Sequence, residues 1–218
     1  YNPWIEKSLN ELAALMPARY AKQEKSEGLL RSVDGYTYRP LFAAQATGDK
    51  PVELTITESA PVSDEVRTAF GEVLAILEQG DKQLGIEKLT YLASQAPMVS
   101  APRINLGIAY NQAGNLDAAE NHLKQALELD TDHPVTLTEL GIIYRKDGRF
   151  AEAKNSYEAA LGAFPGYHFA RRNLAILCDL YLADTECALQ EYEAYIATVQ
   201  DDEEVAIWIA DLDNRMGR

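Results

Sequence analysis

The sequence predicts an all-α fold in which one helix-turn-helix unit is stacked several times. A pentapeptide recurs every 34 residues: residues 106–110 read Leu-Gly-Ile-Ala-Tyr, residues 140–144 read Leu-Gly-Ile-Ile-Tyr, and residues 174–178 read Leu-Ala-Ile-Leu-Cys. Single glycines between apolar runs recur at the same interval. A fixed period of this length is typical of solenoids, in which each unit packs only against its neighbours.

Each predicted hairpin turn is marked by a glycine, at Gly80, Gly114 and Gly148. Glycine suits the left-handed helix end at which a chain reverses direction. Small residues follow five positions later, and larger ones four positions after those, so paired helices can approach closely while large side chains fill the space between neighbours. These positions are Gly85, Ala119 and Ala153, followed by Leu89, Leu123 and Tyr157.

Residues 1–62 precede the repeats and are predicted to form an N-terminal extension. Apolar side chains in residues 3–16 keep a helical period that stops at Pro17, which predicts an amphipathic helix. Residues 18–48 contain scattered glycines and aromatics and are assigned to helix and loop. Residues 52–57 alternate apolar and polar side chains, as a strand does. Because a single strand has no partner, we expect an extended segment along the solenoid and not part of a sheet.

The repeated residues resemble the tetratricopeptide repeat (TPR) family, whose first helix carries Leu-Gly-x-x-Tyr and whose second carries Ala-x-x-x-Phe and a proline. In the two best copies, Leu106, Gly107, Tyr110, Ala119 and Ala126 correspond to Leu140, Gly141, Tyr144, Ala153 and Ala160. The resemblance implies a right-handed α-solenoid over residues 63–201. Its four units are expected at 66–99, 100–133, 134–167 and 168–201.

The last residues, 202–218, are predicted to form a C-terminal capping helix. The acidic run 201–204 suits a helix start, where negative charge meets the positive end of the helix dipole. One side of the helix then carries apolar residues that would cover the exposed end of the last repeat. These residues are Val205, Trp208, Ile209, Leu212 and Met216.

Charge and hydropathy narrow the classes of partner. The 218 residues contain 20 basic and 34 acidic side chains, giving a net charge of -14, which repels nucleic acid and anionic lipid. The sequence contains no apolar run long enough to span a bilayer, so membrane insertion is not expected. The chain begins at Tyr1 without a leader sequence, and we expect a trimmed or mature form.

The two cysteines, Cys178 and Cys187, are nine residues apart. This spacing is too wide for a CxxC redox pair and lacks the histidines of a zinc site. On the two helices of one hairpin their Cα atoms could come within disulfide range, which would matter in an oxidising compartment. The spacing alone favours two small buried side chains in helix packing over a bridge.

No catalytic, cofactor or metal motif is present in the sequence. It lacks GxSxG, HExxH, GxxxxGK and GxGxxG patterns. The histidines, His122, His133 and His168, occupy unrelated phases of the repeat and are interpreted as surface or helix-end residues. The sequence therefore predicts a non-enzymatic protein without cofactor or metal.

The resemblance to TPR proteins implies that the first helices of successive units line a groove for an extended peptide or a partner helix. The inward positions implied by the family are Asn105, Ile108, Asn111, Gln112, Thr138, Glu139, Ile142, Arg145, Lys146, Phe169, Arg172, Asn173, Ile176 and Asp179. Asn105 and Asn173 occupy the same place in alternate units, and an asparagine can hold a peptide backbone through its carbonyl and its amide. The row Ile108, Ile142 and Ile176 is either an apolar groove floor or core packing between first helices.

The charged groove positions suggest one kind of partner and disfavour another. Arg145, Lys146 and Arg172 are candidate anchors for a partner's carboxylates, or else ordinary surface charge. The carboxylate clamp of chaperone-binding TPR domains requires Lys, Asn, Asn, Lys and Arg. This chain has Phe70, Leu74, Asn105, Val135 and Glu139 in those places. Binding of chaperone C-termini is therefore disfavoured.

Two functions remain open from the sequence. The first is a protein-interaction adaptor that binds a protein or peptide in the groove. The second is a structural assembly unit, a possible homo-oligomer, whose groove is filled by its own or a neighbouring copy's N-terminal segment. Residues 173–182 and 208–212 resemble the end of TPR proteins of the Gram-negative cell envelope, some of them associated with TonB-type systems. That resemblance implies a periplasmic location, with the cytoplasm as the alternative.

Overall fold

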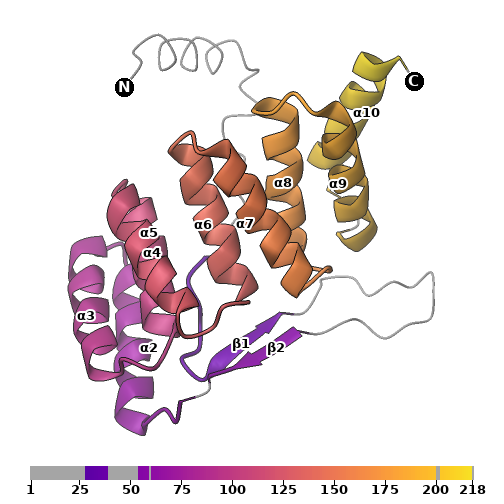
Figure 1. Ribbon diagram of the computed structural model, residues 1–218. Coiled ribbons are helices and arrows are strands. Elements are labelled where there is room, and N and C mark those ends of the chain that lie inside the picture. The colour runs from indigo at the N-terminus through magenta and orange to yellow at the C-terminus, as the bar shows by residue number, and fades with distance from the viewer. Residues whose placement is uncertain (1–27, 39–53, 59, 200–201, 218) are drawn as a thin grey trace.

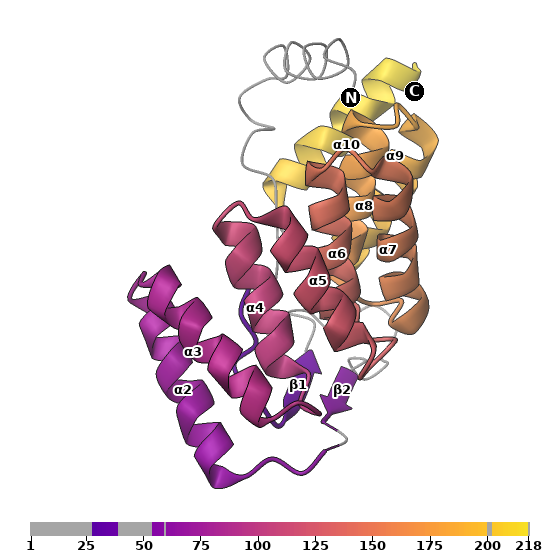
Figure 2. The same ribbon diagram turned by 60° about the vertical axis from the view of Figure 1, so that its left-hand side comes forward.

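The computed structural model describes residues 28–38, 54–58, 60–199 and 202–217. Its helices follow one another in antiparallel pairs that stack side by side (Figures 1 and 2). The pairs are α2 (Asp64–Glu78) with α3 (Lys82–Gln95), α4 (Ala101–Gln112) with α5 (Leu116–Leu127), α6 (Pro134–Lys146) with α7 (Phe150–Ala163), and α8 (His168–Leu180) with α9 (Thr185–Thr198). This arrangement confirms the predicted fold class, a right-handed α-solenoid. Within the described ranges, no helix has the length and hydropathy needed to cross a membrane.

Three of the turns between paired helices are built on glycine. Gly80, Gly114 and Gly148 have φ angles of 90°, 80° and 76°, a left-handed conformation that side chains other than glycine adopt at a cost. An added Cβ at these positions would meet no atom within 4 Å, so backbone conformation and not space requires the glycine. In the fourth pair the left-handed residue is Ala183, with φ of 52°.

Glycines inside the first helices allow the second helix of each pair to come close. A Cβ on Gly107 would lie 2.4 Å from the Leu123 side chain, and one on Gly141 would lie 2.4 Å from Tyr157. Leu123 and Tyr157 are fully buried. Each large side chain on a second helix therefore occupies volume that a glycine on the first helix leaves empty, which keeps the packing dense.

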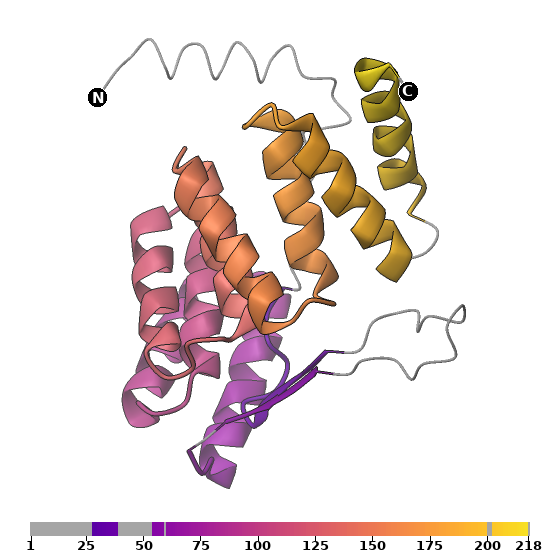
Figure 3. The same cartoon turned by 45° about the vertical axis from the view of Figure 1, so that its right-hand side comes forward.

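Helix α10 (Glu203–Met216) follows the last pair and packs against α9 (Figure 3). The Asp202 side chain accepts a hydrogen bond from the Val205 amide and so begins the helix. Val205, Trp208 and Leu212 are buried, and the Trp208 ring lies 5.4 Å from the ring of Tyr192 on α9. Ile207, between them, is exposed.

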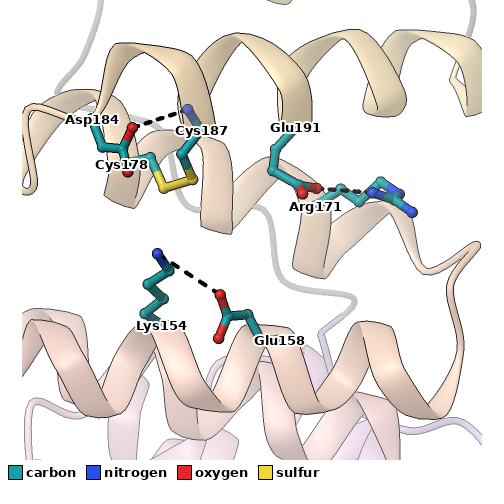
Figure 4. The surroundings of a disulfide bond; sticks show 7 residues. All are labelled: Lys154, Glu158, Arg171, Cys178, Asp184, Cys187 and Glu191. Atoms are coloured by element: carbon teal, nitrogen blue, oxygen red, sulfur yellow. Dashed lines mark hydrogen bonds and ion pairs between the residues drawn. A yellow bond between two sulfur atoms is a disulfide. The ribbon is translucent and has the colours of Figure 1, made fainter.

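Cys178 on α8 and Cys187 on α9 form a disulfide, with Cα atoms 5.9 Å apart (Figure 4). The interpretation of two unbridged cysteines is therefore wrong. The turn between the helices places the end of α8 directly opposite the start of α9, which brings the two Cα atoms within the range of disulfides. Sequence separation alone does not determine which faces of two helices meet.

The N-terminal extension contains a β-hairpin, so the expectation that residues 52–57 lie outside any sheet is also wrong. Strand β1 (Gly35–Tyr38) pairs antiparallel with β2 (Leu54–Thr57), with Tyr36 opposite Ile56 and Tyr38 opposite Leu54. The partner strand lies in the stretch assigned to helix and loop, where only four residues alternate. The predicted helix at residues 3–16, with most of residues 18–48 and residues 52–53, lies outside the described residues.

Candidate functional site

The inner face is defined here as the surface of the first helices α4, α6 and α8 that carries the predicted groove positions. Gln112 and Lys146 on this face are exposed and Phe169 is partly buried. The other predicted positions are buried: Asn105, Ile108, Asn111, Thr138, Glu139, Ile142, Arg145, Arg172, Asn173, Ile176 and Asp179. Because buried side chains must contact other protein atoms, further segments of the chain cover this face.

Asn105, near the middle of α4, holds the main chain of Leu30. The Leu30 amide donates to Asn105 Oδ1 at 2.7 Å, and Asn105 Nδ2 donates to the Leu30 carbonyl at 3.1 Å. Asn105 is fully buried, and Leu30 is 4% exposed. The asparagine side chain thus pairs with a peptide group through both its acceptor and its donor, and the peptide comes from the chain's own N-terminal segment.

Residues that follow Leu30 continue along the starts of the first helices. Val33 and Tyr36 are buried, and the Tyr36 ring lies 5.9 Å from that of His133, the residue that precedes α6. His133 is 2% exposed, and its Nδ1 has no hydrogen-bond partner in the part of the chain that the structure describes. Burial lowers the pKa of His133 to about 4, so its ring is neutral at pH 7.

Tyr38 lies at the α7–α8 turn, at the start of the next first helix. Its ring meets Phe164 and Tyr167 edge-on, with centroids 5.3 Å away in both cases, and lies 5.5 Å from the ring of His168. The Tyr38 hydroxyl donates to the Gly166 carbonyl at 3.2 Å and forms a second hydrogen bond with His168 Nδ1. Tyr38 is 2% exposed, so both ends of its side chain are enclosed.

Glu58, after β2, attaches the other strand of the hairpin to the start of α4. Its carboxylate accepts hydrogen bonds from the Ser100 amide at 2.8 Å, the Ser100 hydroxyl at 2.6 Å and the Ala101 amide at 3.0 Å. These amides belong to the first turn of the helix, where a carboxylate is stabilised by unpaired N–H groups and the dipole. A cavity of about 270 Å³ lies beside this contact, between Glu58, Asp130 and His133.

The hairpin and the segment before it therefore run across three successive first helices. Residues 28–38 and Glu58 contact α4 at Ser100 and Asn105, α6 at His133, and α8 at His168. In Figures 1 and 3 the hairpin lies beside the ends of these helices. We call this set of contacts the hairpin interface.

Two of the three predicted cationic anchors lie at the other end of the inner face, near the carboxyl ends of α4 and α6. Arg145 Nη1 donates to the Tyr181 hydroxyl at 3.0 Å, with its guanidinium 5.4 Å from the ring centroid. Lys146 Nζ donates to Asn111 Oδ1 at 2.9 Å. The structure thus brings together four of the predicted positions here, since Gln112 follows Asn111 at the end of α4. A role for these cations in binding a partner's carboxylates stays a prediction.

Two predicted positions of the fourth unit, Arg172 and Asp179, are directed instead toward α10. The Arg172 guanidinium lies 4.9 Å from the Trp208 ring centroid and donates to Glu204 at 2.8 Å. Asp179 accepts from Arg215 at 2.5 Å. These residues connect the last repeat to α10. Asn173, the counterpart of Asn105, donates to the Phe169 carbonyl of its own helix at 2.8 Å.

Sequence reasoning missed the aromatic and charged residues of the hairpin interface: Tyr36, Tyr38, Glu58, Phe164, His133 and His168. One signal was available, because Gly35–Tyr38 alternates small and aromatic residues just as residues 52–57 alternate polar and apolar ones. Two such stretches favour a hairpin. The interpretation of the histidines as helix-end residues is confirmed for His133 and His168. No cluster of metal-ligating side chains occurs within the described ranges.

Comparison with known proteins agrees with this geometry. Two tetratricopeptide repeat models match residues 99–166 and 138–203. The solved structures with a similar fold include MamA from Desulfovibrio magneticus RS-1, with a TM-score of 0.63, 16% identity, and coverage of 72% of this chain and 88% of that one. PilF of Pseudomonas aeruginosa has a TM-score of 0.64 and 19% identity, and the alignment covers 70% of each chain. Residues 99–203 thus belong to the tetratricopeptide repeat family.

Curated relatives match less than half of this chain. A protein O-mannosyl-transferase of Caenorhabditis elegans is 32% identical over 87 residues, which are 39% of this chain and 13% of the relative. A probable SPINDLY N-acetylglucosaminyltransferase of Solanum lycopersicum is 36% identical over 74 residues, which are 34% of this chain and 8% of the relative. The chain therefore spans a small part of each relative's length. A further similar structure, the first TPR domain of RPAP3, is bound to the HSP90 peptide SRMEEVD, with a TM-score of 0.52 and 18% identity.

Proposed function

We propose that this chain is a non-enzymatic protein-interaction scaffold that holds an extended polypeptide segment on its inner face. The observation that carries the proposal is the pair of hydrogen bonds between Asn105 and the Leu30 main chain, at 2.7 Å and 3.1 Å. An amide that pairs with a peptide group recognises the backbone whatever side chain is attached. This contact therefore suits any extended segment in the same register.

The transferase activities named for the two relatives are not part of this proposal. The matches cover 13% and 8% of those proteins, and the family that this chain matches is a helical repeat that supplies packing surfaces. A repeat region of this kind serves to position a partner, and it recurs in proteins of unrelated activity.

A second candidate function, a structural assembly unit, is favoured by the origin of the segment at Asn105. Residues 28–38 come from this chain, so a neighbouring copy could supply the same residues in an exchanged assembly. Light scattering of the full chain over a range of concentrations tests this candidate. A monomer mass throughout would exclude it, whereas a dimer at high concentration would favour it over the adaptor.

Cross-linking tests the adaptor function directly. A photoreactive residue placed at Gln112 or at Lys146, both exposed on the inner face, should form covalent adducts with the partner in extracts of the native source. The same residue at Asn155, exposed on the second helix α7, is the matched control and should form none. Adducts at position 155 and none at 112 or 146 would place the partner on the outer surface and contradict the proposal.

We also propose a periplasmic location, which the disulfide supports because such bonds persist in oxidising compartments. Association with a TonB-type envelope system also remains a prediction. The thiol state of the native protein is the test. If alkylation in denaturant, after the cells are quenched with acid, leaves Cys178 and Cys187 unmodified, the bond exists in the cell, whereas full labelling would indicate the cytoplasm.

A further inference from the structure

The aromatic recess at the α7–α8 turn has the properties of a side-chain recognition site. Phe164, Tyr167 and His168 belong to the solenoid and surround one ring, that of Tyr38, with centroid distances of 5.3, 5.3 and 5.5 Å. Two of these contacts are edge-on, the geometry that aromatic pairs prefer. The Tyr38 ring is contributed by the N-terminal segment, 126 or more residues away in the sequence.

Polar groups at the end of the recess distinguish tyrosine from phenylalanine. The Gly166 carbonyl accepts from the Tyr38 hydroxyl, and His168 Nδ1 forms the second hydrogen bond to the same oxygen. His168 is 7% exposed. A phenylalanine in the recess would leave the partly buried Gly166 carbonyl and the buried His168 without the hydroxyl, and loss of a hydrogen bond at buried groups is the strongest source of selectivity between the two side chains.

The recess and Asn105 together recognise two points of one extended segment. Asn105 binds the peptide group of Leu30, and the recess encloses the side chain eight residues later. The strands β1 and β2 have four residues each, and a two-stranded hairpin of that size is at best marginally stable by itself. The solenoid therefore determines where this segment lies, and the two points are features of the solenoid.

We propose that the recess is a tyrosine-recognition site, and that a partner protein docks an extended segment whose tyrosine takes the place of Tyr38 while its main chain pairs with Asn105. This inference rests on the proposed scaffold function and adds the chemistry of the partner. Tyr38 is then the resident occupant, which a partner segment displaces.

The recess is tested by removing the Tyr38 side chain and supplying a small molecule of the same shape. In the full chain carrying Tyr38→Ala, p-cresol reproduces the tyrosine side chain and toluene reproduces that of phenylalanine. We expect p-cresol to raise the melting temperature at concentrations about tenfold lower than toluene requires, because only the phenol supplies the hydroxyl. The wild-type chain, whose recess is filled, should respond to neither compound.

A second substitution separates recognition from general packing. In Tyr38→Ala/His168→Phe an aromatic ring is retained at position 168 but one hydrogen-bond partner is lost, so the preference for p-cresol over toluene should shrink. Equal responses to both compounds in Tyr38→Ala would overturn the recognition of a hydroxyl. If Tyr38→Ala does not fold by itself, it is refolded in the presence of each compound, and p-cresol should restore the native circular dichroism at lower concentrations than toluene.

The partner segment is tested with labelled peptides of the sequence of residues 28–38, Gly-Leu-Leu-Arg-Ser-Val-Asp-Gly-Tyr-Thr-Tyr. The protein used is the full chain carrying Tyr38→Ala. Fluorescence anisotropy should show that it binds this peptide at least about tenfold more tightly than it binds the same peptide ending in phenylalanine. Equal affinity would overturn the proposal, and so would a concentration-dependent dimer of the wild-type chain that Tyr38→Ala abolishes, since the occupant would then be a second copy. The cross-linking at Gln112 and Lys146 would still report the scaffold function independently.

Discussion

At the scale of single residues, His133 is a helix-end residue of the solenoid that the N-terminal segment covers. It precedes α6 and faces the Tyr36 ring of the N-terminal segment. Burial is the largest influence on its pKa, which falls to about 4 from the ordinary value of 6.5. The folded chain therefore holds the neutral ring, whereas the unfolded chain takes up a proton at pH 6.5. Stability from this residue is present above pH 6.5 and is lost as the pH falls toward 4.

We predict that lowering the pH from 7 to 4.5 destabilises the wild-type chain more than His133→Asn. The difference in the free energy of unfolding should be on the order of 2 kcal/mol, since only the wild type must release a proton to fold. Asparagine retains a side chain suited to a helix start. Urea unfolding followed by circular dichroism at both pH values measures the difference, and parallel pH profiles of the two chains would refute the assignment.

At the scale of one element, the α8–α9 turn lacks the glycine found in the other three turns. Ala183 takes a left-handed conformation with φ of 52°, which costs an alanine about 1 kcal/mol relative to glycine. The disulfide between Cys178 and Cys187 spans this turn, and closing a loop of that length in the unfolded chain contributes about 3 kcal/mol. The covalent link therefore outweighs the unfavourable turn residue.

We predict that Ala183→Gly stabilises the chain by about 0.5–1 kcal/mol, with the disulfide intact or replaced in Cys178→Ala/Cys187→Ala. Gly148→Ala, the opposite change in the α6–α7 turn, should destabilise by a similar amount because φ is 76° there. A Cβ at this position meets no atom within 4 Å, so no steric clash adds to the cost. Thermal unfolding of the wild type, the cysteine double variant, Ala183→Gly in each of these two backgrounds and Gly148→Ala measures both effects. A loss of stability in Ala183→Gly would show that the turn is not strained.

At the scale of the whole molecule, the N-terminal segment connects units that otherwise touch only their neighbours. Glu58, Tyr36 and Tyr38 meet the starts of α4, α6 and α8 in that order. A solenoid without such a connection is held together by contacts between adjacent units. The hairpin interface therefore adds long-range contacts across the inner face. If these contacts are weakened, we expect the hairpin to open independently of the helices.

We predict that Asn105→Ala speeds hydrogen exchange at the Leu30 amide and in the hairpin by about 30-fold. Losing two buried hydrogen bonds costs about 2 kcal/mol of local stability. Amides in α7 and α9 should change little, and Asn155→Ala, on the exposed side of α7, serves as the control. Mass spectrometry of exchanged peptides measures this effect. Uniform acceleration over the whole chain would mean that the segment does not open separately.

The repeat itself was predictable because its causes are local and periodic. Gly107 and Leu123, or Gly141 and Tyr157, are complementary within one helix pair, so their spacing in the sequence already predicts the contact. Asn105 was likewise predicted to bind a peptide backbone from its position in the repeat. The sequence could not identify that backbone, since no periodicity relates Leu30 to a residue 75 positions away.

The sequence by itself determined the stacked helix pairs, their glycine turns and the apolar side of the last helix, since each depends on residues within one or two units. Only the tertiary structure decided the occupant of the inner face, the strand partner of Leu54–Thr57 and the Cys178–Cys187 bond. These features depend on which surfaces meet after the helices have packed. A long-range contact forms between surfaces that are each built from residues far apart in the sequence, so no local sequence pattern predicts it.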